Sequence, residues 1–178
     1  MKEVEVKILE INRKEIEEKL INLGAKKIFD GDIHDFRLDN AQKQIRSCGQ
    51  LLRIRTEGKK TLLTFKEKSG ENTVLSTHEL EVVVSDFDTI KELLSNLGFT
   101  AFASLKKHRT SYEHNGLHYE FDRYIEEHAF VPEYLEIEGH DTEEVFAAAR
   151  TLGFSQDDCK PWVVPEVIDY YTKKKNKL

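Results

Sequence analysis

The sequence predicts an α+β protein: an antiparallel β-barrel of about eight strands that forms a tunnel, with helices packed outside it. Two observations lead to this fold class. Strand-like stretches alternate apolar and charged residues along most of the chain, as in Glu3–Lys7, where Val4 and Val6 share one face and the charges share the other. Amphipathic helical stretches lie between the strands and are available to cover their apolar faces.

Composition limits the class of protein. With 178 residues and no long linker, we expect one domain, with strands over about 1–140 and a helical part over 141–178. A net charge of −6 argues against a nucleic-acid partner. No apolar run is long enough to span a membrane, and strand-like sequence begins at once, so we expect a cytoplasmic protein without a membrane partner. Cys48 and Cys159 fit reduced thiols.

Three helices are predicted by cap and stop signals. Asn12 can cap a helix over 13–23, and Ser85 or Asp86 can cap a second helix that ends before Gly98. A third helix is expected over 142–152. Each closes on a Leu-Gly pair, which indicates a weak repeat of strand–helix–strand type.

The remaining stretches read as strands, turns and connections. The Asn115-Gly116 pair predicts a tight hairpin, and further turns are expected at 58–60 and 69–72. Residues 40–49 read as a polar connection, and residues from Pro161 onward as a loop followed by a final helix. The predicted strands cover residues 3–8, 25–39, 51–55, 62–66, 77–82, 99–112, 118–122 and 134–138.

The charged faces of these strands carry the functional signal. A single charged face is usually solvated, and an open sheet with cross-strand ion pairs would explain one or two of them, but not seven. We therefore expect the charges to point into the tunnel. The acids are Glu3, Glu5, Glu79, Glu81, Glu120, Asp122, Glu136 and Glu138, and the bases are Lys7, Arg53, Arg55, Lys66, Lys107 and Arg109.

This set of charges suggests a ligand. Grouped carboxylates repel one another and favour a divalent cation, and ligation by oxygen alone suits Mg²⁺ or Mn²⁺. Grouped arginine and lysine side chains favour a polyanion, and the arginine fork matches phosphate oxygens. Both together are what a metal-bound triphosphate requires.

The same residues resemble a known family. Glu3-x-Glu5-x-Lys7, Arg53-x-Arg55, Lys66, Glu79-x-Glu81, Lys107-x-Arg109, Asp122 and Glu136-x-Glu138 are similar, in order, to the CYTH superfamily, or triphosphate tunnel metalloenzymes. That superfamily includes class IV adenylyl cyclases, thiamine triphosphatases and inorganic tripolyphosphatases. The resemblance implies an eight-stranded tunnel and a triphosphate substrate with Mg²⁺ or Mn²⁺. Arg37 departs from the pattern, since members often have a tyrosine there.

The resemblance also implies roles for the site residues. Glu79 and Glu81 would orient the bases or contribute to a second metal, and Glu120 would be a supporting or wall residue. The metal ligands would be Glu3, Glu5, Asp122, Glu136 and Glu138. The phosphate-binding residues would be Lys7, Arg53, Arg55, Lys66, Lys107 and Arg109. Among these we expect the catalytic residues to be Glu5, Glu138, Lys7 and Arg55.

Several activities fit this site. Hydrolysis of inorganic tripolyphosphate or a nucleoside triphosphate is favoured, because cyclisation of ATP to cyclic AMP and pyrophosphate also needs a pocket for the nucleoside. Thiamine triphosphate is a third substrate, with Trp162 stacking on its ring, although a packing role for Trp162 is the better interpretation. A non-catalytic polyphosphate- or nucleotide-binding module is the alternative of another class. The chain is expected to be a monomer or homodimer.

The histidines carry no recognisable metal motif. The sequence has seven, without HxH or HExxH spacing, so we expect surface or packing positions for all of them. His108 lies between Lys107 and Arg109 and should therefore point out of the tunnel.

Overall fold

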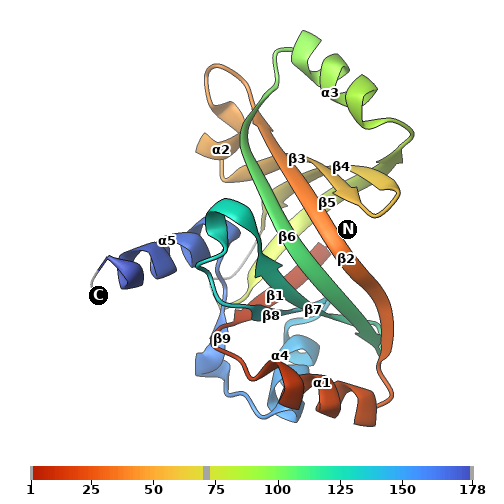
Figure 1. Ribbon diagram of the computed structural model, residues 1–178, viewed down its shortest axis with the longest axis vertical. Coiled ribbons are helices and arrows are strands. Elements are labelled where there is room, and N and C mark those ends of the chain that lie inside the picture. Colours follow the sequence, from red (N-terminus) through yellow and green to blue (C-terminus); the bar gives the residue numbers. More distant parts are fainter. Residues whose placement is uncertain (1, 70–72, 177–178) are drawn as a thin grey trace.

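The computed structural model describes residues 2–69 and 73–176, and its centre is a closed antiparallel barrel (Figure 1). Eight strands follow one another around the barrel in the order β5, β4, β3, β2, β6, β7, β8, β1, and β1 pairs with β5 to close it. The strands are β1 (Lys2–Ile8), β2 (Lys26–Asp39), β3 (Gln50–Glu57), β4 (Lys60–Lys68), β5 (Leu75–Val84), β6 (Thr100–His114), β7 (Leu117–Tyr124) and β8 (Tyr134–Gly139). The predicted fold class is confirmed.

Strand β1 closes the barrel because it has partners on both sides. Its residues pair with β8 on one side, where Glu5 lies opposite Glu138. On the other side the first part of β1 pairs with β5, and its end pairs with the two-residue strand β9 (Cys159–Lys160). The N-terminal strand is therefore part of the tunnel wall.

The helices cover the outside of the barrel. They are α1 (Arg13–Asn22), α2 (Gln44–Ser47), α3 (Phe87–Asn96), α4 (Thr142–Leu152) and α5 (Val164–Lys175). The expected caps are present: the Asn12 side chain accepts from the Glu15 N–H at 3.4 Å, and Asp86 accepts from the Thr89 N–H at 2.7 Å. In Figure 1, α1 and α4 lie together at the bottom of the view and α3 lies at the top.

Apolar residues fill the space between barrel and helices. The largest cluster joins the outer faces of β1, β7 and β8, including Val4, Val6 and Phe121, to α1 and α4. A smaller cluster places Leu38 and Ile54 against Leu94 of α3. The apolar face of each strand is thus turned outward, which leaves the charged face for the interior.

Some segments differ from their predicted form. The polar connection over 40–49 contains the short helix α2, because the Asp39 carboxylate accepts hydrogen bonds from the Ile45 and Arg46 N–H groups at 3.0 and 3.2 Å. Strand β6 has 15 residues and begins at Thr100, directly after the second Leu-Gly pair as the repeat predicts, and it extends two residues beyond the predicted end at 112. The hairpin at Asn115-Gly116 is confirmed, with both residues at positive φ. Of the turn expected at 69–72, residues 70–72 lie outside the described part.

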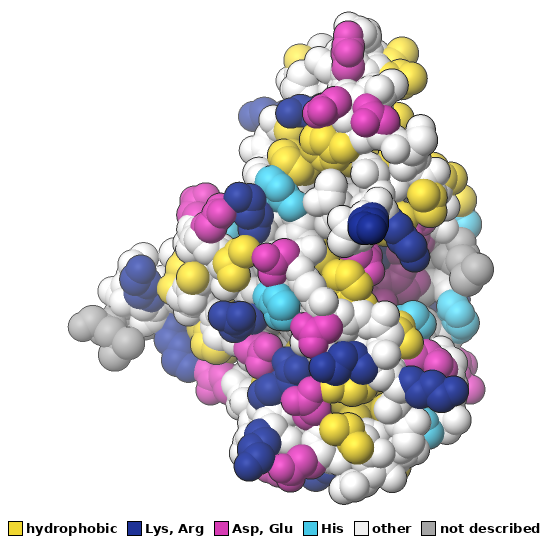
Figure 2. Space-filling view, turned by 45° about the vertical axis from the view of Figure 1, so that its right-hand side comes forward, with side chains coloured by type: hydrophobic (Ala, Val, Ile, Leu, Met, Phe, Trp, Pro, Cys, Tyr) yellow, Lys and Arg dark blue, Asp and Glu magenta, His cyan; other side chains and the backbone are white. Residues whose placement is uncertain are grey.

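The outer surface mixes its charges. On the face shown in Figure 2, acidic and basic side chains are interspersed over much of the molecule. None of the described helices is both long and apolar enough to cross a membrane. Both cysteine thiols are free, Cys48 exposed and Cys159 buried.

Candidate active site in the tunnel

Carboxylates and cations from all eight strands meet inside the barrel. Strand register brings them together: Glu5 lies opposite Glu138, Lys7 opposite Glu136, and Arg109 opposite Asp122. The tunnel has two ends. Glu3, His118 and Glu138 mark one, called the mouth below, and Tyr124 and Tyr134, at the opposite ends of β7 and β8, mark the inner end.

At the inner end, Asp122 holds two cations. Its carboxylate accepts from the Lys107 ammonium at 2.5 Å and from the Arg109 guanidinium at 2.7 and 2.6 Å, and Tyr134 donates its hydroxyl at 3.4 Å. Asp122 is 0% exposed. Arg109 also pairs with Glu120, which was expected to be a supporting or wall residue. Burial favours the neutral acid, but Arg109 and Lys107 outweigh it and lower the pKa of Asp122.

A second shared carboxylate, Asp35, is one that the sequence interpretation missed. It pairs with Arg55 at 2.6 Å and lies 3.9 Å from Arg53. Against the effect of burial, these two arginines hold the pKa of Asp35 far below its ordinary value. The signal was present in the alternation of Asp35, Arg37 and Asp39 along a predicted strand.

Two lysines lie nearer the mouth. Lys7, 1% exposed, contacts Glu5 at 2.5 Å and Glu136 at 3.1 Å. Burial works against its charge, but these carboxylates raise its pKa above the ordinary value. Lys66 contacts Glu3 at 2.7 Å and Glu79 at 2.6 Å.

The supporting pair from β5 contacts bases as expected. Glu79 contacts Lys66, and Glu81 lies 3.8 Å from the Arg53 guanidinium and accepts from the Thr64 hydroxyl at 2.8 Å. These contacts favour the interpretation that Glu79 and Glu81 orient bases.

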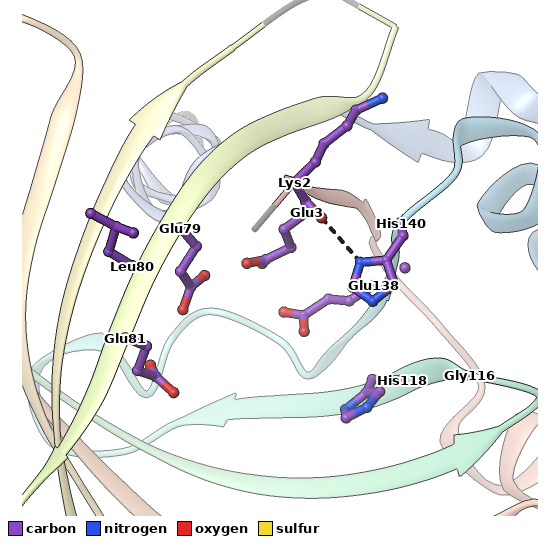
Figure 3. A pocket seen from close by; sticks show the side chains of 10 residues that line it. Lys2, Glu3, Glu79, Leu80, Glu81, Gly116, His118, Glu138 and His140 are labelled. Carbon is purple, nitrogen blue, oxygen red and sulfur yellow. Dashed lines mark hydrogen bonds between the residues drawn. The ribbon is translucent and has the colours of Figure 1, made fainter.

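At the mouth, carboxylates gather around a pocket of about 450 Å³. Figure 3 shows the Glu3 and Glu138 side chains side by side, both pointing into the pocket toward the strand that carries Glu79 and Glu81. One oxygen from each of Glu3, Glu5 and Glu138 lies within 4.8 Å of the others, so these three residues form a group able to hold a metal ion. We call them the mouth carboxylates.

The electrostatics of the mouth carboxylates differ from those of Asp122 and Asp35. Burial and the neighbouring Glu120 and Glu136 raise the pKa of Glu138 well above its ordinary value. Burial also raises the pKa of Glu5 and of Glu3, with further contributions from Glu136 and Glu79 respectively. Like charges held this close need a cation, and the donors are oxygen atoms alone, so the residues present fit Mg²⁺ or Mn²⁺.

A histidine also lies at the mouth. His118 comes within 4.8 Å of Glu120 and Glu138, forming a second group that could hold a metal. His118 lies on the same face of β7 as Glu120 and Asp122. The sequence shows this alternation of polar residues, although it contains no histidine motif for metal binding. His108 does point outward, to Asp30 and Asp32 at 3.0 and 2.9 Å.

The predicted site residues therefore divide into two sets. Glu3, Glu5 and Glu138 come together as a metal-capable group. Asp122 and Glu136, predicted in the same group, lie outside this convergence of oxygens; like Glu3 and Glu5 they also contact cations, Asp122 through Lys107 and Glu136 through Lys7. The predicted phosphate-binding residues Lys7, Arg53, Arg55, Lys66, Lys107 and Arg109 all lie in the tunnel, each against at least one carboxylate.

Comparison with known proteins agrees with the fold and identifies the family. A family model described as the CYTH domain matches residues 1–158, and the chain belongs to the CYTH family. This family is a group of metal-dependent triphosphate tunnel enzymes. A Methanocaldococcus jannaschii protein provisionally named an adenylate cyclase is 26% identical over 113 residues, 64% of this chain. That match spans 65% of the relative, slightly less than two thirds of its length.

Solved structures share the barrel. A Pyrococcus horikoshii protein superposes with a TM-score of 0.76 at 28% identity, covering 93% of this chain and 98% of that one. A Hippeastrum protein, provisionally called an adenylyl cyclase and described as having a dominant triphosphatase activity, gives a TM-score of 0.66 at 16% identity. That alignment covers 95% of each chain and concerns the fold alone.

Proposed function

We propose that this protein is a metal-dependent phosphohydrolase of inorganic tripolyphosphate or a nucleoside triphosphate. The observation that carries the proposal is the separation of charge along one tunnel. Carboxylates with raised pKa values gather at the mouth beside Lys7 and Lys66, and the arginines, with Lys107, lie deeper in the tunnel. A phosphate chain with its metal ion carries the complementary charges.

The mouth carboxylates Glu3, Glu5 and Glu138 are the proposed metal ligands. A bound Mg²⁺ or Mn²⁺ would lower the pKa of a water molecule and offset charge on the phosphate oxygens. Asp122 and Glu136 are proposed to position bases, since their oxygens already accept from Lys107, Arg109 and Lys7. This assignment replaces their expected role as metal ligands.

The cations bind and stabilise the phosphate chain. Lys7 and Arg55 are the proposed catalytic cations, which stabilise the charge that develops on the departing phosphate. Lys66, Arg53, Lys107 and Arg109 bind the other phosphate oxygens. Glu5 and Glu138 would hold the metal ion, which would supply a water of lowered pKa. Because each cation rests against a carboxylate, the substrate exchanges these ion pairs for its own.

Adenylyl cyclisation is the second candidate. It is supported by the names of relatives, since the Methanocaldococcus jannaschii protein is provisionally called an adenylate cyclase. The Hippeastrum protein carries the same kind of name, yet its dominant activity is described as triphosphatase, which favours hydrolysis. The pocket at the mouth is lined by charged side chains, histidines, glycines and Leu80 rather than by Phe, Tyr or Trp.

Two other readings have less support. Thiamine triphosphate would require an aromatic platform near the mouth. Trp162 instead packs against the apolar cluster of the inner end, and its ring centroid lies 5.3 Å from that of Tyr170. A non-catalytic phosphate-binding module needs the cations but not three converging carboxylates.

Product analysis by phosphorus NMR tests the proposal. The protein is incubated with Mg²⁺ or Mn²⁺ and, separately, with tripolyphosphate, ATP and thiamine triphosphate. We expect orthophosphate from tripolyphosphate or ATP, with no turnover in EDTA. Pyrophosphate and cyclic AMP from ATP would establish the cyclase instead, and binding without turnover would establish the binding module.

A further inference from the structure

Arg37 is the exception among the cations of the tunnel. Each of the six predicted phosphate-binding residues contacts a carboxylate, whereas Arg37 makes no ion pair and no side-chain hydrogen bond within the described residues. Its Nε atom is buried without an acceptor. The residue as a whole is half-buried, and a buried donor of a charged group that has no acceptor is unfavourable, so its presence calls for an explanation.

The orientation of Arg37 follows from its strand. Phe36 and Leu38 belong to the outer cluster against α3. Arg37 lies between them, so its side chain points to the opposite face, which is also the face of Asp35. The register of β2 and β3 places Arg37 directly opposite Arg53. Both guanidinium groups therefore face the interior from neighbouring strands.

Arg37 lies toward the inner end of the tunnel. The ionisable groups that act on it are Asp35, Tyr124, Arg53 and Tyr134. Tyr124 and Tyr134 belong to an apolar cluster that also contains Val167 and Tyr171 of α5. The hydroxyl groups of the two tyrosines lie 3.3 Å apart. The inner end thus combines unpaired positive charge with hydroxyl donors.

The inner end has fewer carboxylates than cations require. Asp122 contacts both Lys107 and Arg109, and Asp35 contacts both Arg53 and Arg55. Glu120 adds a contact to Arg109 and Glu81 one to Arg53, which leaves four carboxylates for these four cations and none for Arg37. Arg37 has none, and burial, the largest influence, lowers its pKa below the ordinary value. An anion with several oxygens would satisfy both the unpaired Arg37 and its neighbour Arg53, and the arginine fork favours phosphate.

We propose that Arg37, with Arg53, forms a phosphate-binding position at the inner end that holds the terminal phosphate of the substrate chain. This inference rests on the proposed function and names its substrate class as inorganic chains of three or more phosphates, which have a terminal phosphate at each end. One terminal phosphate then lies at Arg37, and the other lies near the mouth carboxylates, where hydrolysis would release orthophosphate.

Binding of inorganic tripolyphosphate, measured by calorimetry in EDTA so that no turnover occurs, tests the inference. Arg37→Met should weaken tripolyphosphate binding about 10- to 100-fold, the equivalent of one hydrogen-bonded charge. Arg123→Met is the matched control, since Arg123 is exposed on the outward face of β7, and it should bind as the wild type does.

Thermal unfolding of the ligand-free variants gives a second readout. Removing an unpaired buried charge should leave the midpoint of Arg37→Met unchanged or raise it, whereas a structural role for Arg37 would lower it. Wild-type affinity in Arg37→Met, or weaker affinity accompanied by a lowered midpoint, would overturn the inference. If the wild type itself fails to bind tripolyphosphate both in EDTA and with Ca²⁺, the proposed function fails instead.

Discussion

The mouth and the inner end of the tunnel contain the same kinds of residue in opposite electrostatic states. At the inner end, Asp122 is surrounded by bases that lower its pKa. At the mouth, Glu138 is surrounded by other carboxylates that, with burial, raise its pKa. The difference shows that a buried carboxylate is defined by its neighbours across the barrel, and these are set by strand register. Both ends contain ion pairs, but at the mouth burial and neighbouring carboxylates outweigh Lys7 and Lys66, so that end needs a further cation.

The largest expected effect is on the inner end. Asp122→Asn leaves Lys107 and Arg109 buried with their main carboxylate removed, and we expect a loss of about 3–5 kcal/mol in the free energy of unfolding. Urea denaturation measures it. Glu92→Gln, on the exposed face of α3, is the control and should change stability little. A loss in Asp122→Asn as small as that of the control would remove the distinction between the two ends.

The same kind of substitution at the mouth should act on turnover instead of stability. Glu138→Gln removes one proposed metal ligand and a crowded negative charge, so we expect metal-dependent turnover to fall about 100- to 1000-fold while the fold stays intact. Initial rates of phosphate release across a Mn²⁺ titration measure this effect. Unchanged rates at saturating Mn²⁺ would show that the metal is bound elsewhere.

The pH dependence of the metal-free protein compares the two ends directly. The pKa values of Glu3, Glu5 and Glu138 are raised in the folded state, so their stabilising effect is complete below the ordinary value of 4.5 and is lost as the pH rises through the raised values. Stability in EDTA should therefore decline as the pH is raised from 4.5 into the neutral range. Unfolding midpoints across this range test it, and Glu138→Gln should flatten the decline. A stability that rises with pH would mean that the inner carboxylates, whose pKa values are lowered, dominate instead.

The smallest loss of stability is expected for Glu81, which lines the pocket at the mouth. Glu81 lies 3.8 Å from Arg53, and its side chain is 34% exposed, so Glu81→Gln should cost about 0.2–1 kcal/mol of stability. Arg53 keeps its contact with Asp35. Urea denaturation at low and high salt would show whether even this contribution is screened. A loss of stability as large as that of Asp122→Asn would show that Glu81 stabilises the fold as strongly as the carboxylates of the inner end do.

The barrel could be predicted because its signal is repeated. Alternation of apolar and charged residues recurs on strand after strand, and each strand of this kind, such as Glu3–Lys7, can satisfy both faces only if the barrel closes with its charges inside. The helix α2 was missed because it depends on one local contact, the Asp39 carboxylate accepting from two backbone N–H groups. A periodic pattern of apolar and polar residues does not reveal a single local contact of this kind.

The sequence predicted which residues face the tunnel, but not which of them contact one another. Each charged strand was identified, yet strand register decides that Asp122 meets Arg109 and that Glu5 meets Glu138. A shift of two residues would preserve the inward face and exchange the partners. Asp35 and His118 show a related limit, since each has the right alternation but belongs to no short motif.

The double pairing of β1 has a consequence for how the protein folds. Val4 pairs with Gly139 on one side and with Ser76 on the other, so the first strand finds its partners only after much of the chain is available. Contacts of such long sequence separation make folding slow. The mouth carboxylates come from β1 and β8, and they do not exist as a group until that late step. A metal ion that binds them acts on the completed barrel alone and, by mass action, holds it closed.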